Sequence, residues 1–387
     1  MLCRRNIRAG WLRRLCPPLA RALEKQSWTS ILERIVIWAC NGFTKKDLWA
    51  TDIALFGQDI TRTKEYKEAD VIHLHWVNQG FLSLRTIGKI ARSGKKVVWT
   101  MHDEWPLDGV EHYTNSPTPA PPLGEGEVTE VSRDISPSPR VGVGVGLVLR
   151  SKKRIYSLRT ITFVTCSRWL REISERKELA QGQRVVNIPN PIDSALFAPL
   201  TAQQRAEYRA LLGLPEDKRL VLFVAQNVKD ERKGVRYLDE ACALFDDKEI
   251  LVVALGRDLP YISKVEDMAR LYAAVDVFVT PSLSDNLPNT IMEAMACGTP
   301  CVGFNVGGIP EMIDHRENGY VARYKDARDL ADGIRYVLSR REELGVAARE
   351  KVLRCYSEEA VAKRYLSEYS RGSGSSGLSG SSGSAHL

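Results

Sequence analysis

The stretch PSLSDNLPNTIMEAMACGTP, residues 281–300, decides the fold. A short apolar run at 275–280 precedes it, and a helical pattern at 289–297 lies within it. Pro288 stands where a helix start tolerates a missing N–H, and Gly298 stands where a helix end favours glycine. A strand that passes through a polar loop into a helix is a βα unit, so this stretch predicts a parallel sheet.

The same alternation of short apolar runs and longer amphipathic runs extends in both directions along the chain. Strands are expected at 71–75, 97–101, 161–165, 185–188, 220–225, 250–255, 275–280 and 301–304. Helical patterns lie between them, for example at 81–91, 234–245 and 289–297. Pro189 and Pro191 interrupt the pattern, because proline disfavours helix at itself and at the residue before it. The sequence therefore predicts an α/β protein with two Rossmann-like domains, at 50–189 and 190–370.

Composition and charge exclude several classes of protein. Of the 387 residues, 44% are hydrophobic, and no apolar run approaches the ~20 residues of a membrane-spanning helix. The net charge is +7, and residues 1–25 carry seven Lys and Arg against one Glu. The nearly neutral remainder argues against a nucleic-acid-binding surface, which needs basic residues spread over a folded face. The basic N-terminal segment, 1–49, is instead expected to touch anionic lipid through residues 1–25.

Two further segments differ in composition from their surroundings. Residues 115–147 include 11 Pro and Gly among 33 and are expected to form an irregular insertion. Residues 371–387 include 12 Gly and Ser and are expected to form a flexible tail. The eight cysteines form no CxxC pair, so a zinc site or a disulfide framework is not expected. Reduced thiols indicate a cytoplasmic protein.

In open parallel sheets, ligands bind at the carboxyl ends of the strands, so the loops after the strands are the candidate sites. In the loop and helix after 275–280, Asp285 and Glu293 flank a helix start at Pro288. The free N–H groups and the dipole of that helix favour a phosphate, and the two carboxylates could hold hydroxyls beside it. The alternative is a capped surface helix with two solvated acids.

Lys233 follows the strand at 220–225 and precedes a helix. Its ammonium could neutralise a diphosphate leaving group, while Gly234 lets the backbone approach closely. The alternative is a solvated turn of mixed charge.

Histidines mark the strand ends of the first half. His102 follows the strand at 97–101, next to Asp103, and could contact a sugar or transfer a proton; the alternative is a hydrogen-bonded residue at a strand end. His73 and His75 share one face of a strand and are expected to be a buried pair rather than metal ligands. In the second half, the turn at Gly307 and Gly308 could bring backbone N–H groups to a ligand or be a plain turn.

Taken together and in order, these segments resemble the retaining glycosyltransferases of family 4, of the type that builds bacterial surface polysaccharides. The resemblance rests on the run 285–300, on GGIPE at 307–311, on ADVIHLHW at 69–76, on VWTMHD at 98–103 and on IPNPID at 188–193. It implies the GT-B architecture of two facing Rossmann-like domains. Residues 1–49 show neither the first strand nor the Gly-rich loop of that family, so an incomplete N-terminal domain is expected.

The resemblance also implies roles for individual residues. Glu293 resembles the acid that holds the nucleotide ribose, and Asp285 takes the place of the acid that faces the donor sugar, where members usually have Glu. Asn227 replaces an expected Arg, and Arg232 is its possible substitute. The implied catalytic residues are His102, Asp285 and Lys233. The implied donor-binding residues are Asn227, Arg232, Lys233, Asp285, Asn286, Leu287, Pro288, Asn289, Thr290 and Glu293.

The expected function is retaining transfer of a sugar from a UDP- or GDP-linked donor to a glycan or a lipid-linked acceptor. No Asp-x-Asp motif occurs, so neither a metal nor another cofactor is expected. The expected location is the cytoplasm, peripheral on the inner face of the membrane, and no nucleic-acid partner is expected. Two alternatives stay open: an inactive, truncated remnant with a binding or scaffold role, and a sugar-nucleotide epimerase. A nicotinamide dehydrogenase is disfavoured, because no G-x-G-x-x-G follows a strand.

Overall fold

The computed structural model describes residues 28–40, 43, 51–110, 112, 139–225, 230–245 and 249–371, and for 139–144 the backbone alone. The basic segment 1–27, most of the 115–147 segment, Asn227 and the tail from 372 onward lie outside these ranges. Among the described helices, none combines the length and the hydropathy that crossing a membrane requires.

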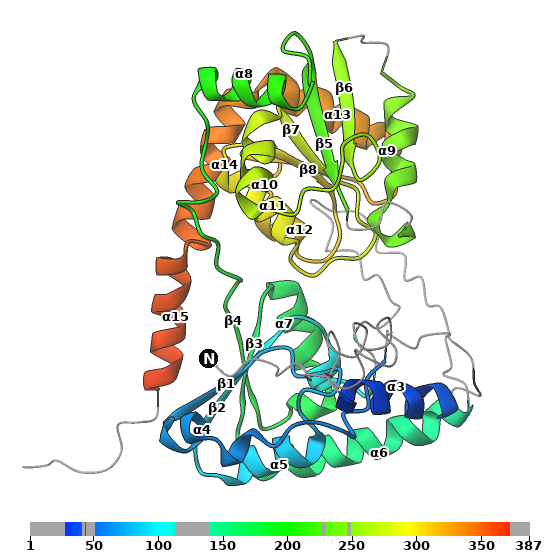
Figure 1. Cartoon of the computed structure of the whole chain (residues 1–387), viewed down its shortest axis with the longest axis vertical. Helices are drawn as coiled ribbons and strands as arrows, with labels where there is room; N and C mark the ends of the chain where they lie inside the picture. Colours follow the sequence, from blue (N-terminus) through cyan, green and yellow to red (C-terminus); the bar gives the residue numbers. More distant parts are fainter. Residues whose placement is uncertain are drawn as a thin grey trace, which may run out of the picture.

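The predicted pair of parallel sheets is confirmed (Figure 1). The first sheet has the order β1-β2-β3-β4, and the second has the order β6-β5-β7-β8-β9. The strands are β1 (Val71–Leu74), β2 (Lys96–Met101), β3 (Thr162–Thr165), β4 (Arg184–Asn187), β5 (Arg219–Val224), β6 (Ile250–Leu255), β7 (Val277–Thr280), β8 (Cys301–Phe304) and β9 (Gly319–Ala322). All neighbouring strands pair in parallel, and β3, β7 and β8 are buried along their whole length. Because both faces of these three strands are buried, their sequences do not alternate between apolar and charged residues.

Helices surround each sheet. Those of the first half are α3 (Trp28–Cys40), α4 (Lys64–Glu68), α5 (Leu84–Arg92), α6 (Pro139–Tyr156) and α7 (Arg168–Glu175), with 3₁₀ turns η1 (Ile60–Arg62), η2 (Trp105–Leu107) and η3 (Glu178–Ala180). Those of the second half are α8 (Ala202–Leu211), η4 (Glu231–Lys233), α9 (Val235–Cys242), α10 (Val265–Ala274), α11 (Asn289–Ala296), α12 (Ile309–Met312), α13 (Ala327–Ser339), α14 (Arg341–Cys355) and α15 (Glu358–Ser370). Each half has its own apolar core.

Helix α6 corrects the prediction of an irregular segment at 115–147, because the helix begins at Pro139. Val148, Lys152 and Ile155 are buried at helical spacing on one side of α6. The Lys152 ammonium is fully buried and donates hydrogen bonds to the carbonyl oxygens of Trp105, Asp108 and Gly109. Tertiary contacts of this kind outweigh the low helix propensity of the alternating glycines.

Helix α15 corrects the predicted boundary of the second domain. The sequence predicts the second domain at 190–370, which includes α15, yet α15 packs against the first sheet (Figure 1). Val361 is buried there with Val98 and Val164, and Glu368 forms two hydrogen bonds with Arg184, at 2.8 and 2.9 Å. The chain therefore crosses between the domains a second time after α14.

The two crossings lie side by side. The N–H of Ile192 donates to the carbonyl oxygen of Tyr356 at 2.9 Å, and Ile192 forms an isolated parallel bridge with Ser357. The outgoing chain after β4 and the returning chain before α15 are thus joined by backbone hydrogen bonding where they pass from one domain to the other.

Candidate active site

The candidate site lies where the strand order of the second sheet reverses. β5 pairs with β6 on one side and with β7 on the other, so the connections that leave their carboxyl ends diverge, and ligands bind at such points. The connection after β5 contains η4 and Lys233, and the loop after β7 contains Asp285. The sheet order thus brings together two residues that are 52 positions apart in the sequence.

Gly234 fixes these two loops against each other. It has φ +68°, and a Cβ at this position would lie 1.8 Å from the carbonyl oxygen of Pro281. The N–H of Leu283 donates to the carbonyl oxygen of Arg232 at 2.7 Å in the same contact. Gly234 is therefore required by close approach to the β7 loop, a contact that the sequence did not predict.

Lys233 and Asp285 form an ion pair, with Nζ 2.9 Å from Oδ2. Both side chains are partly exposed, so the pair faces solvent on one side. A positive charge and an acceptor carboxylate are thereby held at one point above the sheet. This arrangement can bind an anion through the ammonium and a hydroxyl through the carboxylate.

The glycine turn after β8 packs directly on the Asp285 loop. A Cβ on Gly307, which has φ +56°, would lie 1.8 Å from the carbonyl oxygen of Asp285, and one on Gly308 would lie 2.0 Å from that of Asn286. Their role in the described structure is therefore to let the turn support the site loop.

Asn286 joins the two domains. Its side chain is buried, and its amide nitrogen donates to the Cys166 sulfur at 2.8 Å and to the His102 carbonyl oxygen at 3.2 Å. Its amide oxygen accepts from the Ser167 hydroxyl. The resemblance implied Asn286 as a donor-binding residue, and in this structure its side chain contacts the first domain.

Glu311 forms a second link between the domains. Its carboxylate accepts the N–H groups of Arg168 and Trp169 at 2.8 and 2.7 Å, which are the first residues of α7. An acid at a helix N-terminus satisfies free N–H groups and the positive end of the dipole. The GGIPE motif contains this residue, yet its role depends on a contact with a helix 143 positions away, which no local pattern predicts.

Helix α11 begins as the sequence predicts. Pro288 is its N-cap residue and Asn289 its first residue. Leu287 is buried in the second core. The amide oxygen of the exposed Asn289 accepts a hydrogen bond from Asn190 at 3.1 Å, and Thr290 is half-buried.

Glu293 is half-buried on α11. Burial raises the pKa of its carboxyl, and the phenol of the fully buried Tyr272 acts in the opposite direction. Within the described ranges, no Lys or Arg side chain forms an ion pair with Glu293. Its carboxylate is therefore available to a ligand hydroxyl.

Two further predicted residues have different outcomes. Arg232 is largely exposed and forms an ion pair with Asp230, with Nη2 2.8 Å from Oδ2. It therefore lies beside Lys233 but is engaged within its own turn. Asn227 lies outside the described residues, so its predicted contact stays a prediction.

His102 follows β2 and faces the second domain. Its Nε2 lies 3.5 Å from Nδ1 of His75, and its carbonyl oxygen accepts the hydrogen bond from Asn286. Burial lowers the pKa of His102, against the attraction of Asp103. The imidazole is thus favoured as the neutral form, and the contact with the Asp285 loop is made by the His102 main chain.

The predicted buried pair is wrong for His75, which is exposed, whereas His73 is half-buried and has no free ring nitrogen. Its Nε2 is 2.8 Å from the Thr100 hydroxyl, and its Nδ1 is 2.6 Å from the Tyr369 hydroxyl on α15. Burial, with smaller effects from His75 and His102, lowers the pKa of His73 to about 4. In the described part of the chain, no cluster of three metal-ligating side chains occurs.

A buried ionic network supports the loop that carries His102. Nδ1 of His112 lies 2.6 Å from a carboxylate oxygen of Asp103, and Nε2 lies 3.7 Å from Asp52. Burial opposes the charged imidazole, but the hydrogen bonds and charges of Asp103 and Asp52 outweigh it and raise the pKa of His112 to about 9. The folded protein therefore holds His112 as a cation at neutral pH.

This network predicts a loss of stability at alkaline pH. A pKa raised on folding contributes stability that is complete below the unfolded value of ~6.5 and is lost as the pH rises through about 9. The expected loss between pH 6 and pH 10 is on the order of 3 kcal/mol, measured as the free energy of unfolding in urea. His112→Gln should flatten this part of the pH profile; an unchanged slope in the variant would contradict the assignment.

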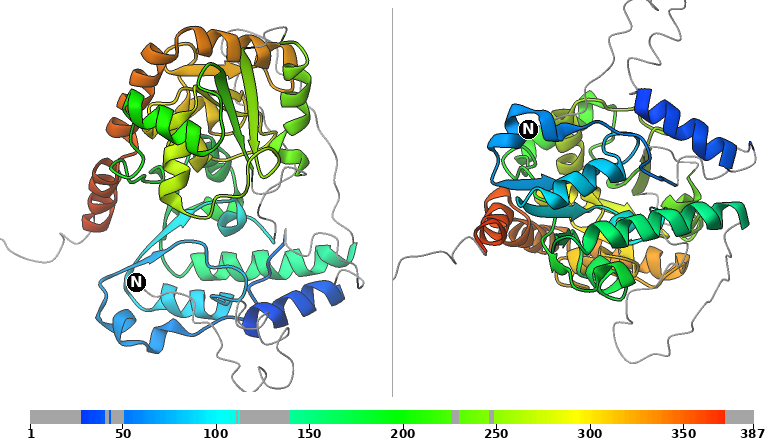
Figure 2. Two further views of the ribbon diagram at one scale, coloured as in Figure 1. Left: turned by 45° about the horizontal axis from the view of Figure 1, so that its top comes forward. Right: turned by 90° about the horizontal axis from the view of Figure 1, so that it is seen from below.

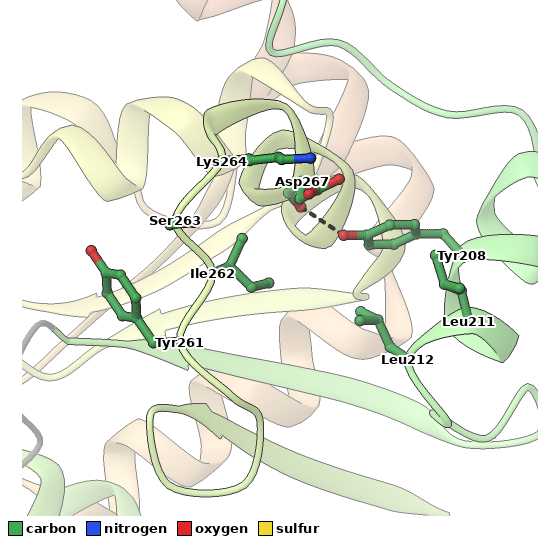
Figure 3. A pocket seen from close by; sticks show the side chains of 8 residues that line it. All are labelled: Tyr208, Leu211, Leu212, Tyr261, Ile262, Ser263, Lys264 and Asp267. Atoms are coloured by element: carbon green, nitrogen blue, oxygen red, sulfur yellow. Dashed lines mark hydrogen bonds between the residues drawn. The ribbon is translucent and has the colours of Figure 1, made fainter.

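A pocket of about 300 Å³ lies elsewhere in the second domain (Figure 3). The Tyr208 hydroxyl donates to the carbonyl oxygen of Asp267 at 2.9 Å and bridges α8 and α10 beside it. The pocket is lined by Tyr208, Leu211, Leu212, Tyr261, Ile262, Ser263, Lys264 and Asp267. None of the predicted site residues is among them, so this pocket is separate from the candidate site.

Comparison with known proteins finds similarity to glycosyltransferases, centred on the second domain. Residues 218–340 match the family model described as "Glycosyl transferases group 1". The chain is 34% identical over 219 residues to N-acetyl-alpha-D-glucosaminyl L-malate synthase of Bacillus anthracis, a match that covers 51% of this chain and 56% of that protein. It is 30% identical over 194 residues to N,N'-diacetylbacillosaminyl-diphospho-undecaprenol alpha-1,3-N-acetylgalactosaminyltransferase of Campylobacter jejuni, covering 45% of this chain and 51% of the relative. The chain thus spans about half the length of the curated relatives it matches.

Solved structures support the two-domain fold. A sucrose-phosphate synthase of Thermosynechococcus elongatus superposes with a TM-score of 0.57 at 23% identity, covering 78% of this chain and 73% of that one. Anabaena HepE, solved with UDP and glucose, superposes with a TM-score of 0.55 at 16% identity, covering 78% of each chain. The predicted GT-B class of fold is confirmed, and the family match and the names of the relatives support a glycosyltransferase.

Proposed function

We propose that this protein is a retaining glycosyltransferase that moves a sugar from a nucleoside-diphosphate sugar to a glycan or a lipid-linked acceptor in surface-polysaccharide synthesis. The observation that carries the proposal is the Lys233–Asp285 pair at the strand-order reversal, beside the start of α11. The names of the relatives support the transferase class, and the UDP in HepE supports a nucleotide-linked donor.

The described residues suggest how the donor would be held. The Lys233 ammonium and the free N–H groups of α11 would stabilise the charge that develops on the departing diphosphate, without a metal ion. Glu293, which no cation neutralises in the described part, would accept hydrogen bonds from the ribose hydroxyls. Asp285 would face the donor sugar.

The first domain would supply the acceptor side. His102 is held against the Asp285 loop through Asn286, and as a neutral imidazole it can donate to or accept from a sugar hydroxyl. Attack by the acceptor on the face that the leaving group departs from would retain the configuration at the anomeric carbon. The chemistry would take place in the cytoplasm.

A thermal-shift experiment tests donor binding. UDP or GDP, at 100 times its dissociation constant, should stabilise the protein by about 2.7 kcal/mol and so raise its melting temperature. Glu293→Gln should reduce the shift, because the amide offers the ribose one acceptor oxygen in place of two. Glu317→Gln, at an exposed acid in a turn before β9, serves as the matched control.

The outcomes separate the alternatives. The absence of a shift with any nucleoside diphosphate would contradict the proposed donor site. Binding without release of UDP or GDP from a panel of nucleotide sugars would indicate a non-catalytic remnant. Conversion of the sugar nucleotide itself, in the absence of acceptor, would indicate an epimerase.

A further inference from the structure

Helix α3 turns its charged residues inward. The Glu33 carboxylate accepts N–H groups from Ile53 and Ala54 at 3.1 and 2.6 Å, and Nη2 of Arg34 lies 3.1 Å from the buried Asp52. The helix sequence, WTSILERIVIWAC, contains no other charged residue. Both side chains are therefore engaged inside the first domain, and neither lies on the outer face.

The outer face of α3 is apolar. Trp28, Leu32, Ile35 and Trp38 are 46%, 44%, 51% and 39% exposed. Their spacing of four, three and three residues places them along one side of the helix. This apolar stripe reverses the usual arrangement, in which a surface helix buries its apolar side chains and exposes its charges. An exposed apolar face of this kind marks an interaction surface.

The chemistry around the apolar stripe favours a lipid surface as its partner. A tryptophan lies near each end of the stripe, and indole rings are favoured at the boundary between lipid headgroups and acyl chains. The sequence directly before α3, residues 1–25, carries seven Lys and Arg against one Glu. An apolar helix face next to basic sequence is the combination that binds anionic membranes from the surface.

The position of α3 leaves this face accessible. The helix lies at the periphery of the first domain (Figure 2). We propose that α3 docks the protein on an anionic lipid bilayer, with Trp28, Leu32, Ile35 and Trp38 inserted at the acyl boundary. The surface is separate from the site at β5 and β7, so the inference stands whether or not the protein transfers a sugar.

Vesicle sedimentation of the full chain tests this surface. We expect binding to phosphatidylcholine vesicles that contain phosphatidylglycerol and weaker binding to phosphatidylcholine alone. The vesicle affinity of the double variant Leu32→Gln/Ile35→Gln should fall by roughly tenfold or more, because two aliphatic side chains are lost from the contact. The control Leu211→Gln/Leu366→Gln removes exposed leucines from α8 and α15 and should bind as the unaltered protein does.

Fluorescence quenching gives a second readout that does not depend on the glutamine variants folding. Lipids brominated on their acyl chains should quench the tryptophan emission of the bound protein. Trp28→Phe/Trp38→Phe should bind but lose most of this quenching, since phenylalanine keeps the apolar contact and removes the two indoles of the apolar stripe.

Several results would overturn the inference. One is an absence of binding to phosphatidylglycerol vesicles; another is equal binding by Leu32→Gln/Ile35→Gln. Binding that depends only on residues 1–25 would assign the contact to the basic segment without α3. A dimer that becomes monomeric in the double variant would show that a second copy covers the stripe.

Discussion

Lys233→Ala is expected to lower kcat/KM for sugar transfer by about 10²–10³-fold, the range seen when one group that stabilises a developing anion is removed. Lys233 supplies the positive charge that the sheet order places beside Asp285, in the loop that leads into α11. Its loss would leave the departing diphosphate with the helix N–H groups alone. The measurement is the initial rate of nucleoside-diphosphate release with the donor identified by thermal shift.

Two variants serve as controls for this prediction. Lys264→Ala removes an exposed lysine from the rim of the separate pocket near α10 and should leave the rate unchanged. Lys233→Arg keeps the charge but changes the geometry, so an intermediate rate is expected. A Lys233→Ala enzyme with full activity would remove this residue from the mechanism.

Gly307→Ala should both destabilise the protein and inactivate the site. An alanine at φ +56° costs roughly 1–2 kcal/mol, and its Cβ would overlap the Asp285 carbonyl oxygen, adding about 1–3 kcal/mol. Relief of the overlap requires the Asp285 loop to move, and a shift of ~1 Å in a site costs about 10²-fold in rate. Urea unfolding and the transfer assay measure the two effects.

Gly213→Ala is the matched control for this overlap. Gly213 lies in the same domain with φ +66°, but a Cβ there would meet no atom within 4 Å. The free energy of unfolding of Gly213→Ala should fall only by the cost of placing alanine at a positive φ, and its transfer activity should be unchanged. Equal losses in the two variants would show that the contact with Asp285 does not support the site.

Local sequence predicted β7 and β8 of the second sheet well because both strands are buried along their whole length. The short apolar run 301–304 was read as a strand because it stands between two turn signals, whereas the edge strand β9, GYVA, was not predicted. The helical residues of α6 at 139–147 were missed because their glycines locally disfavour helix, and packing outweighs that preference.

The site was predictable as a set of loops but not as a set of contacts. The rule that ligands bind at strand ends selected the loops of Lys233, Asp285 and His102. It could not show that Lys233 pairs with Asp285, because that depends on the strand order β6-β5-β7. Nor could it show that the Asn286 side chain is directed toward the first domain, since its partners are more than 100 residues away in the sequence.

The two chain crossings at Ile192 and Tyr356 connect the domains by two adjacent, hydrogen-bonded linkers. A single linker would allow rotation of one domain relative to the other about any axis. Two adjacent linkers favour rotation about one axis, which opens and closes the space between the domains. Opening would separate Asn286 from Cys166 and Glu311 from α7, but it would keep α15 on the first sheet. The buried Asn286 and Glu311 therefore supply contacts that would have to break for the two domains to separate.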